Sequence, residues 1–118
     1  MTATFRRQDG LLIARAVGST LDVGTAGPFK QALIAALGES GLSIIVDLSE
    51  VAEIDSSGIG ALVAVLKGAR RFGGSARLCG ARPHVREVLE LTMLHRVLPL
   101  HESLEEALLA ETGAESAG

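Results

Sequence analysis

The run from Ser43 to Leu48, Ser-Ile-Ile-Val-Asp-Leu, constrains the fold more than any other segment of the chain. It is short, apolar and rich in β-branched residues. Such a run is typical of a strand that is buried on both faces of a largely parallel sheet. The chain is therefore expected to fold as an α/β protein with this strand near the centre of its sheet.

The preceding segments predict an antiparallel hairpin and a first helix. Thr4–Arg7 and Leu11–Val17 read as two strands, and Gln8-Asp9-Gly10 joins them because Asp-Gly supplies the backbone freedom that a tight turn needs. A helix is expected from about Thr25 to Leu37, with Pro28 in its first turn.

The following segments alternate helix and strand. The predicted elements are a helix over Ser56–Phe72, a strand over Ala76–Cys79, a helix opened by Pro83, a short strand at Val97-Leu98, and a helix from the capping box Ser103-x-x-Glu106 to about Ala110. The order β-β-α-β-α-β-α-β-α predicts one mixed, mostly parallel sheet of four or five strands with about four helices.

Length and composition indicate the class of protein. The 118 residues suit a single domain over 1–118, with a core at about 4–110 and a frayed tail from Thr112. The net charge of −3 and three aromatic residues argue against nucleic-acid binding. No run reaches the ~20 apolar residues of a membrane span. The single cysteine, Cys79, favours a cytoplasmic location and is expected to be a buried, inert thiol.

Asp55-Ser56-Ser57-Gly58 is the least generic stretch, because it lies between a predicted buried strand and an apolar helix. Asp or Ser at such a position caps a helix by accepting backbone N–H bonds. The same free N–H groups can hold an anion, so a phosphorylated serine would be tolerated there. The motif alone is equally compatible with a plain cap and with a phosphorylation switch.

The helix after this motif has no charged residue between Ile59 and Val65. Ile59, Leu62, Val63 and Leu66 are spaced as a core stripe, and small uncharged residues occupy the other side. The pattern predicts a helix enclosed by neighbours for most of its length, with an exposed first turn.

Motifs for catalysis or cofactor binding are incomplete. Gly58-x-Gly60 lacks the third glycine of a dinucleotide loop, there is no Walker A sequence, and Ser57 is not in a Gly-x-Ser-x-Gly elbow. The three histidines share no metal-ligand spacing and are expected at the surface or in caps. No catalytic residue, metal or cofactor is predicted.

The chain resembles the STAS domains of bacterial anti-sigma-factor antagonists. The resemblance is carried by Ile44–Leu48 and by Ile54 to Gly60, and it extends over roughly residues 4–110. Leu21-Asp22 is similar to the Leu-Asp that opens the first helix in that family.

The resemblance implies a function as a binding protein and not as an enzyme. The unphosphorylated antagonist would bind an anti-sigma factor that is also a serine kinase with an ATP-binding fold, and so release a sigma factor. Phosphorylation of the serine after the aspartate, here Ser56, would abolish binding, and a phosphatase would restore it. The antagonist would be a monomer or weak dimer. Its contact zone for the anti-sigma factor would include Asp22, Asp55, Ser57, Gly58 and Ile59.

Two positions depart from the family pattern. Ser19-Thr20 stands where Gly-Glu is frequent, and Glu50 stands where a glycine recurs. Both leave the identity of the partner open.

A second interpretation is a structural STAS subunit of a signalling scaffold or lipid-transport complex, in which Ser56 only caps the helix. An enzyme or small-ligand binder is the third, and it would need a deep polar pocket beside Ser56.

Overall fold

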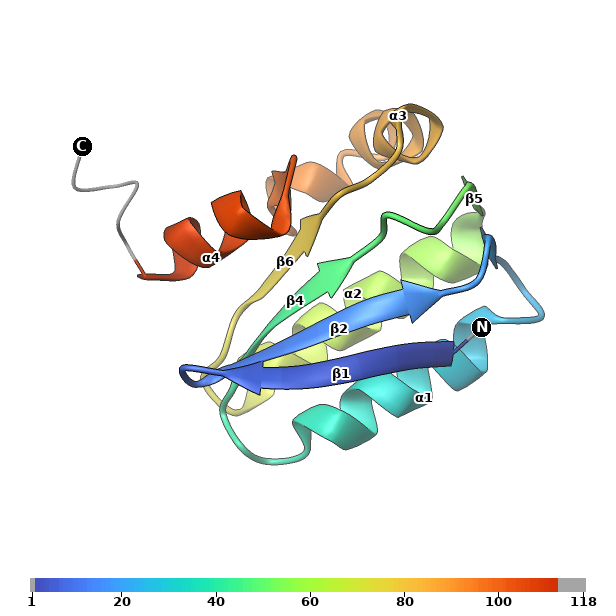
Figure 1. Ribbon diagram of the computed structural model, residues 1–118. Helices are drawn as coiled ribbons and strands as arrows, with labels where there is room; N and C mark the ends of the chain where they lie inside the picture. Colours follow the sequence, from blue (N-terminus) through green and yellow to red (C-terminus); the bar gives the residue numbers. More distant parts are fainter. Residues whose placement is uncertain (1, 113–118) are drawn as a thin grey trace.

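A computed structural model describes residues 2–112 and shows a five-stranded mixed sheet in the order β1-β2-β4-β6-β7 (Figure 1). Its strands are β1 (Thr2–Gln8), β2 (Leu11–Val17), β4 (Ser43–Asp47), β6 (Ala76–Cys79) and β7 (Leu100–His101). β1 is antiparallel to β2, and the other neighbours are parallel. The predicted fold class is confirmed, with the strand from Ser43 at the centre.

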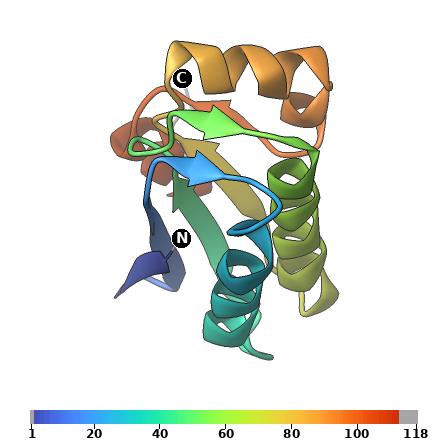
Figure 2. The same ribbon diagram turned by 90° about the vertical axis from the view of Figure 1, so that its right-hand side faces the viewer.

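Within residues 2–112 the chain forms four α-helices: α1 (Ala26–Leu37), α2 (Ser56–Arg71), α3 (Pro83–Leu91) and α4 (Leu104–Thr112). α1 and α2 lie side by side on one face of the sheet and α4 covers the other (Figures 1 and 2). The main core lies between the sheet and α1, α2 and α3, while α4 packs on a smaller cluster of Leu11, Ile45, Cys79 and Ala107.

Turn and cap residues form as their chemistry predicts. Asp9 and Gly10 both have positive φ, 51° and 79°, which is the conformation of a tight hairpin turn. At α4, Ser103 Oγ accepts from Glu106 N at 3.2 Å. The part of the predicted frayed tail beyond Thr112 lies outside the described residues.

The prediction of the last strand at Val97-Leu98 is wrong. Leu94–Arg96 forms a 3-10 turn, η1, and Leu98 N bonds back to Leu94 O at 2.9 Å. The apolar pair therefore closes a helical turn, in which Leu98 is buried. The strand begins after Pro99, at β7.

The structure also contains a small sheet that the sequence analysis missed. β3 (Thr20–Leu21) pairs in parallel with β5 (Glu53–Ile54), below α3 in Figure 2. Two-residue strands carry no periodicity, so no local pattern could reveal them.

The core stripe of α2 is rotated from the predicted one. Leu62 and Leu66 are buried as expected, but Val65 from the opposite side is buried too. Ile59 and Val63 are only half-buried. The buried arc is wide because α2 contacts both the sheet and α1.

Candidate functional site

The N-terminus of α2 is built around the carboxylate of Asp55. Asp55 Oδ1 accepts hydrogen bonds from Ser57 N at 2.8 Å and Gly58 N at 3.1 Å, and its carbonyl accepts from Ile59 N at 3.0 Å. Ser56, the first residue of the helix, is exposed and takes no part in this cap. The capping function therefore belongs to Asp55, and the hydroxyl of Ser56 remains accessible.

Asp22 is brought to the same place by the small sheet. Leu21 of β3 is opposite Ile54 of β5, so Asp22 and Asp55 follow neighbouring strand ends. The link is direct, because Asp55 N donates to Leu21 O at 3.2 Å. The side chain of Asp22 accepts from Gly24 N at 2.9 Å, which shapes the loop into α1. Two acidic residues thus follow adjacent strand ends at the start of α2, where Ser56 is exposed.

Gly58 has a packing function that the sequence analysis did not assign. It is buried, and a Cβ added there would lie 2.5 Å from Leu21 O and 2.7 Å from Ile54 Cγ1. The start of α2 can approach the small sheet only because this side chain is absent. Gly58 is therefore buried and positions its neighbours, and its contact with a partner stays a prediction.

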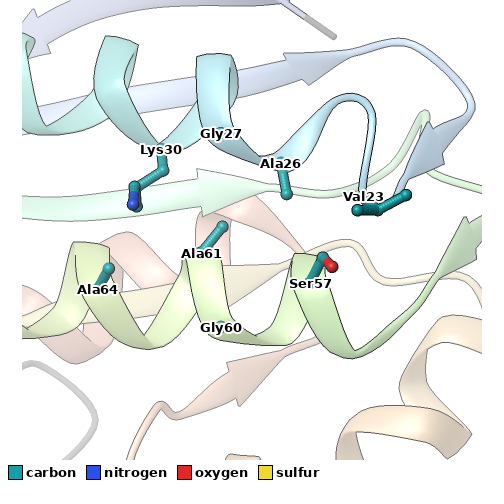
Figure 3. A pocket seen from close by; sticks show the side chains of 8 residues that line it. All are labelled: Val23, Ala26, Gly27, Lys30, Ser57, Gly60, Ala61 and Ala64. Carbon is teal, nitrogen blue, oxygen red and sulfur yellow. The ribbon is translucent and has the colours of Figure 1, made fainter.

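A hollow of about 230 Å³ lies between α1 and α2, beside the Asp55 cap (Figure 3). Its lining is mostly small and apolar: Val23, Ala26, Gly27, Lys30, Ser57, Gly60, Ala61 and Ala64. Ser57 lies at one end of it and Lys30 further along α1. Lys30 and Gly27 did not stand out in the sequence, and Gly60 was considered only in the incomplete Gly58-x-Gly60 motif and in the family resemblance.

The chemistry available at this site is limited. Asp55 already accepts from two of the α2 N–H groups that could otherwise bind an anion, those of Ser57 and Gly58. No three His, Cys, Asp or Glu side chains converge to hold a metal ion anywhere in residues 2–112. Nor is any helix in that stretch long and apolar enough to cross a membrane.

Cys79, His101 and Glu111 each have a defined structural environment away from Ser56. Burial and the neighbouring Asp47 carboxylate raise the pKa of the Cys79 thiol to about 12, in agreement with an inert thiol. Arg77 NH1 lies 3.1 Å from His101 Nε2, so His101 is a half-buried strand residue with a half-buried partner and not a simple surface or cap histidine. Glu111 Oε1 accepts from Ser75 Oγ at 2.7 Å and fastens α4 to the sheet.

The departure at Glu50 has a clear structural consequence. Its carboxylate lies 2.8 Å from the guanidinium of Arg15 on β2. Both side chains are substantially exposed, so the pair adds little stability. It fixes the surface beside the sheet rather than the surface around Ser56.

Comparison with known proteins identifies the family. The sequence model of the STAS domain matches residues 2–107. BtrV of Bordetella bronchiseptica, assigned as an anti-sigma factor antagonist, is 31% identical over 110 residues, which cover 93% of this chain and 94% of that protein.

Solved structures agree with this match. A STAS domain protein from Planctomyces limnophilus, described as an anti-sigma-factor antagonist, superposes with a TM-score of 0.84 at 24% identity over 93% of this chain and 97% of that one. The anti-sigma factor antagonist SpoIIAA in its unphosphorylated form gives 0.77 at 20% identity over 94% and 96%. Its phosphorylated form from Bacillus gives 0.67 at 19% over 90% and 96%. At these identities the structures establish the fold, and with the sequence match they show that the chain belongs to the STAS domain family.

Proposed function

We propose that this chain is an anti-sigma-factor antagonist that binds an anti-sigma factor when Ser56 is free and loses binding when Ser56 is phosphorylated. The observation that carries the proposal is the exposed Ser56 hydroxyl, set beside an Asp55 that already caps the helix. A serine that is not needed as a cap is available for another function. The relative BtrV is assigned as an antagonist, and SpoIIAA has been solved both without and with a phosphoryl group.

The partner supplies the chemistry in this proposal. A serine kinase anti-sigma factor with an ATP-binding fold transfers the γ-phosphoryl group of ATP to Ser56 Oγ, and ADP leaves while the hydroxyl proton goes to a base. A phosphatase later hydrolyses the phosphate ester with water. The chain itself acts as substrate and binding surface, and it works in the cytoplasm as a single domain, a monomer or weak dimer, without catalytic residues or a cofactor.

The surroundings of Ser56 explain how a phosphate would act. The nearest capping donors, Ser57 N and Gly58 N, are bonded to Asp55. Neither Asp22 nor Asp55 forms an ion pair with another of residues 2–112. A phosphate adds about −1.5 to −2 charges at pH 7. This charge would add to those of Asp22 and Asp55, and an interface that fits the uncharged serine would have to bury it without a partner.

Some residues around Ser56 are accessible to a partner, whereas Gly58 is buried and holds them in place. Asp22, Asp55 and Ser57 are at least partly accessible and Ile59 is half-buried, so these residues form the proposed contact zone. Gly58 supports that zone from beneath.

The site assignment is tested by phosphoryl transfer from [γ-³²P]ATP with the anti-sigma factor kinase of the same genome. Ser56→Ala is expected to abolish incorporation, whereas Ser40→Ala, at an exposed serine after α1 and outside the contact zone, keeps it. If Ser56→Ala is labelled as well as the wild type, the assignment fails. A stable complex with a signalling scaffold or lipid-transport machinery, formed without any phosphoryl transfer, would instead support the structural-subunit interpretation.

A further inference from the structure

We propose that the groove between α1 and α2 receives a segment of the anti-sigma factor, with an apolar side chain against Val23 and a carboxylate paired with Lys30. This inference rests on the proposed function, from which it takes the partner. It adds a second contact region along the helices, beyond the immediate surroundings of Ser56 (Figure 3).

The glycines of the groove are not explained by the fold. Gly58 and Gly74 need to be glycine, because a Cβ at either would collide with the backbone of Leu21 or Leu42. At Gly27 and Gly60 a Cβ would meet nothing within 4 Å, and neither has a positive φ. Glycine inside a helix lowers its stability relative to alanine. What Gly27 and Gly60 share is that both line the groove, where a missing side chain permits close approach by another molecule.

Two side chains of the groove are left without internal partners. Val23 is 82% exposed, the largest value among the exposed large apolar residues of the described chain. Lys30 lies in the wall of the groove, and no carboxylate of residues 2–112 forms a salt bridge with it. An apolar anchor and a single cation in one hollow fit a protein segment that carries an apolar and an acidic side chain.

The charge distribution favours the anti-sigma factor over other occupants. Asp22 and Asp55 lie at the Ser56 end and Lys30 lies further along α1, so the surface has a negative and a positive end. A segment that docks along the groove with its carboxylate at Lys30 has one orientation relative to Ser56. A second copy of this chain would set one concave groove against another and leave a void. A small ligand would find only Lys30 and Ser57 as polar groups in an open hollow.

The test measures the affinity of the anti-sigma factor kinase of the same genome for purified variants, by calorimetry without ATP so that no phosphorylation occurs. Gly60→Leu fills the groove and Lys30→Glu reverses its charge. Each is expected to weaken binding by about tenfold or more. The matched controls are Gln31→Leu, a new exposed leucine outside the groove, and Lys67→Glu, the same charge reversal on α2 outside it. Both are expected to stay within about threefold of the wild type.

Thermal unfolding shows whether each variant keeps its fold, and Gly60→Leu is expected to do so because its site is open. Ser56→Asp separates the two proposals. If Ser56→Asp loses binding while Gly60→Leu and Lys30→Glu bind as the wild type does, the groove is not a contact and the proposed function stands. If the unmodified wild type does not bind the kinase, both proposals fall. If the wild type is a dimer that Gly60→Leu makes monomeric, a second copy occupies the groove and the inference is overturned.

Discussion

Replacing Gly58 with alanine tests how the site is held in place. The added Cβ would lie 2.5 Å from Leu21 O, 2.7 Å from Ile54 Cγ1 and 2.9 Å from Leu21 Cγ. The carbonyl of Leu21 cannot move freely, because it accepts the hydrogen bond from Asp55 N at 3.2 Å. Relief of the clash therefore requires the start of α2 to move away from β3 and β5.

The magnitude follows from two opposing effects. Forcing an extra carbon into a packed site typically costs about 1–3 kcal/mol, and a clash with fixed backbone belongs at the upper end. Alanine recovers up to about 1 kcal/mol of helix propensity. The expected net loss in the free energy of unfolding is about 2 kcal/mol, which lowers the Tm of a domain of this size by roughly 5–10 °C.

The assay is urea unfolding followed by circular dichroism, with the denaturant slope m compared between variants. Gly60→Ala is the matched control two residues along the same helix, where the site is open, and it is expected to raise stability by about 0.5–1 kcal/mol. Opposite signs at Gly58 and Gly60 would support the packing assigned here. A Gly58→Ala variant as stable as the wild type would refute it.

Three further predictions follow from individual contacts. Asp55→Ala removes two hydrogen bonds of 2.8 and 3.1 Å and is expected to lower the free energy of unfolding, measured in urea, by about 1–2 kcal/mol. Ser56→Ala is expected to change it by less than about 0.5 kcal/mol. Equal losses would contradict the conclusion that Asp55 caps the helix and Ser56 does not. Burial raises the pKa of Cys79 in the folded chain from 9.0 to about 12, so the thiol of the unfolded chain ionises first as the pH rises. The free energy of unfolding is therefore expected to fall above pH 9. In urea titrations across that range, Cys79→Ala should show a shallower fall. Glu111→Ala, which removes the 2.7 Å bond to Ser75 and the 3.7 Å ion pair with Arg77, is expected to raise hydrogen exchange in α4 by about fivefold without comparable change in α2, and an unchanged rate would show that α4 does not depend on these two contacts.

Much of the fold was predictable because the signals are local. The β-branched run from Ser43 identifies the central strand, Asp9-Gly10 identifies the hairpin, and Asp55 identifies the start of α2. Each of these rests on the conformational or hydrogen-bonding preference of one or two residues. The family resemblance added the expected phosphoacceptor, Ser56.

The remaining features depend on contacts between distant segments. The pairing of β3 with β5 brings Asp22 close to Asp55. Strands of two residues have no sequence periodicity, so this pairing could not be predicted. The burial of Gly58 depends on that same pairing. The groove needs α1 and α2 to lie side by side, so the relation of Lys30 to Gly60 appears only in three dimensions.

The central claim is that a charge on Ser56 turns binding off, and the most direct test compares one protein before and after modification. The wild type is phosphorylated stoichiometrically at Ser56, verified by mass spectrometry, and its dissociation constant for the anti-sigma factor is measured by calorimetry in parallel with the unmodified form. Phosphorylation is expected to weaken binding by at least about a hundredfold, because an interface that fits a neutral hydroxyl would have to bury an unpaired charge, which typically costs about 3–5 kcal/mol. Equal affinity of the two forms would contradict the account.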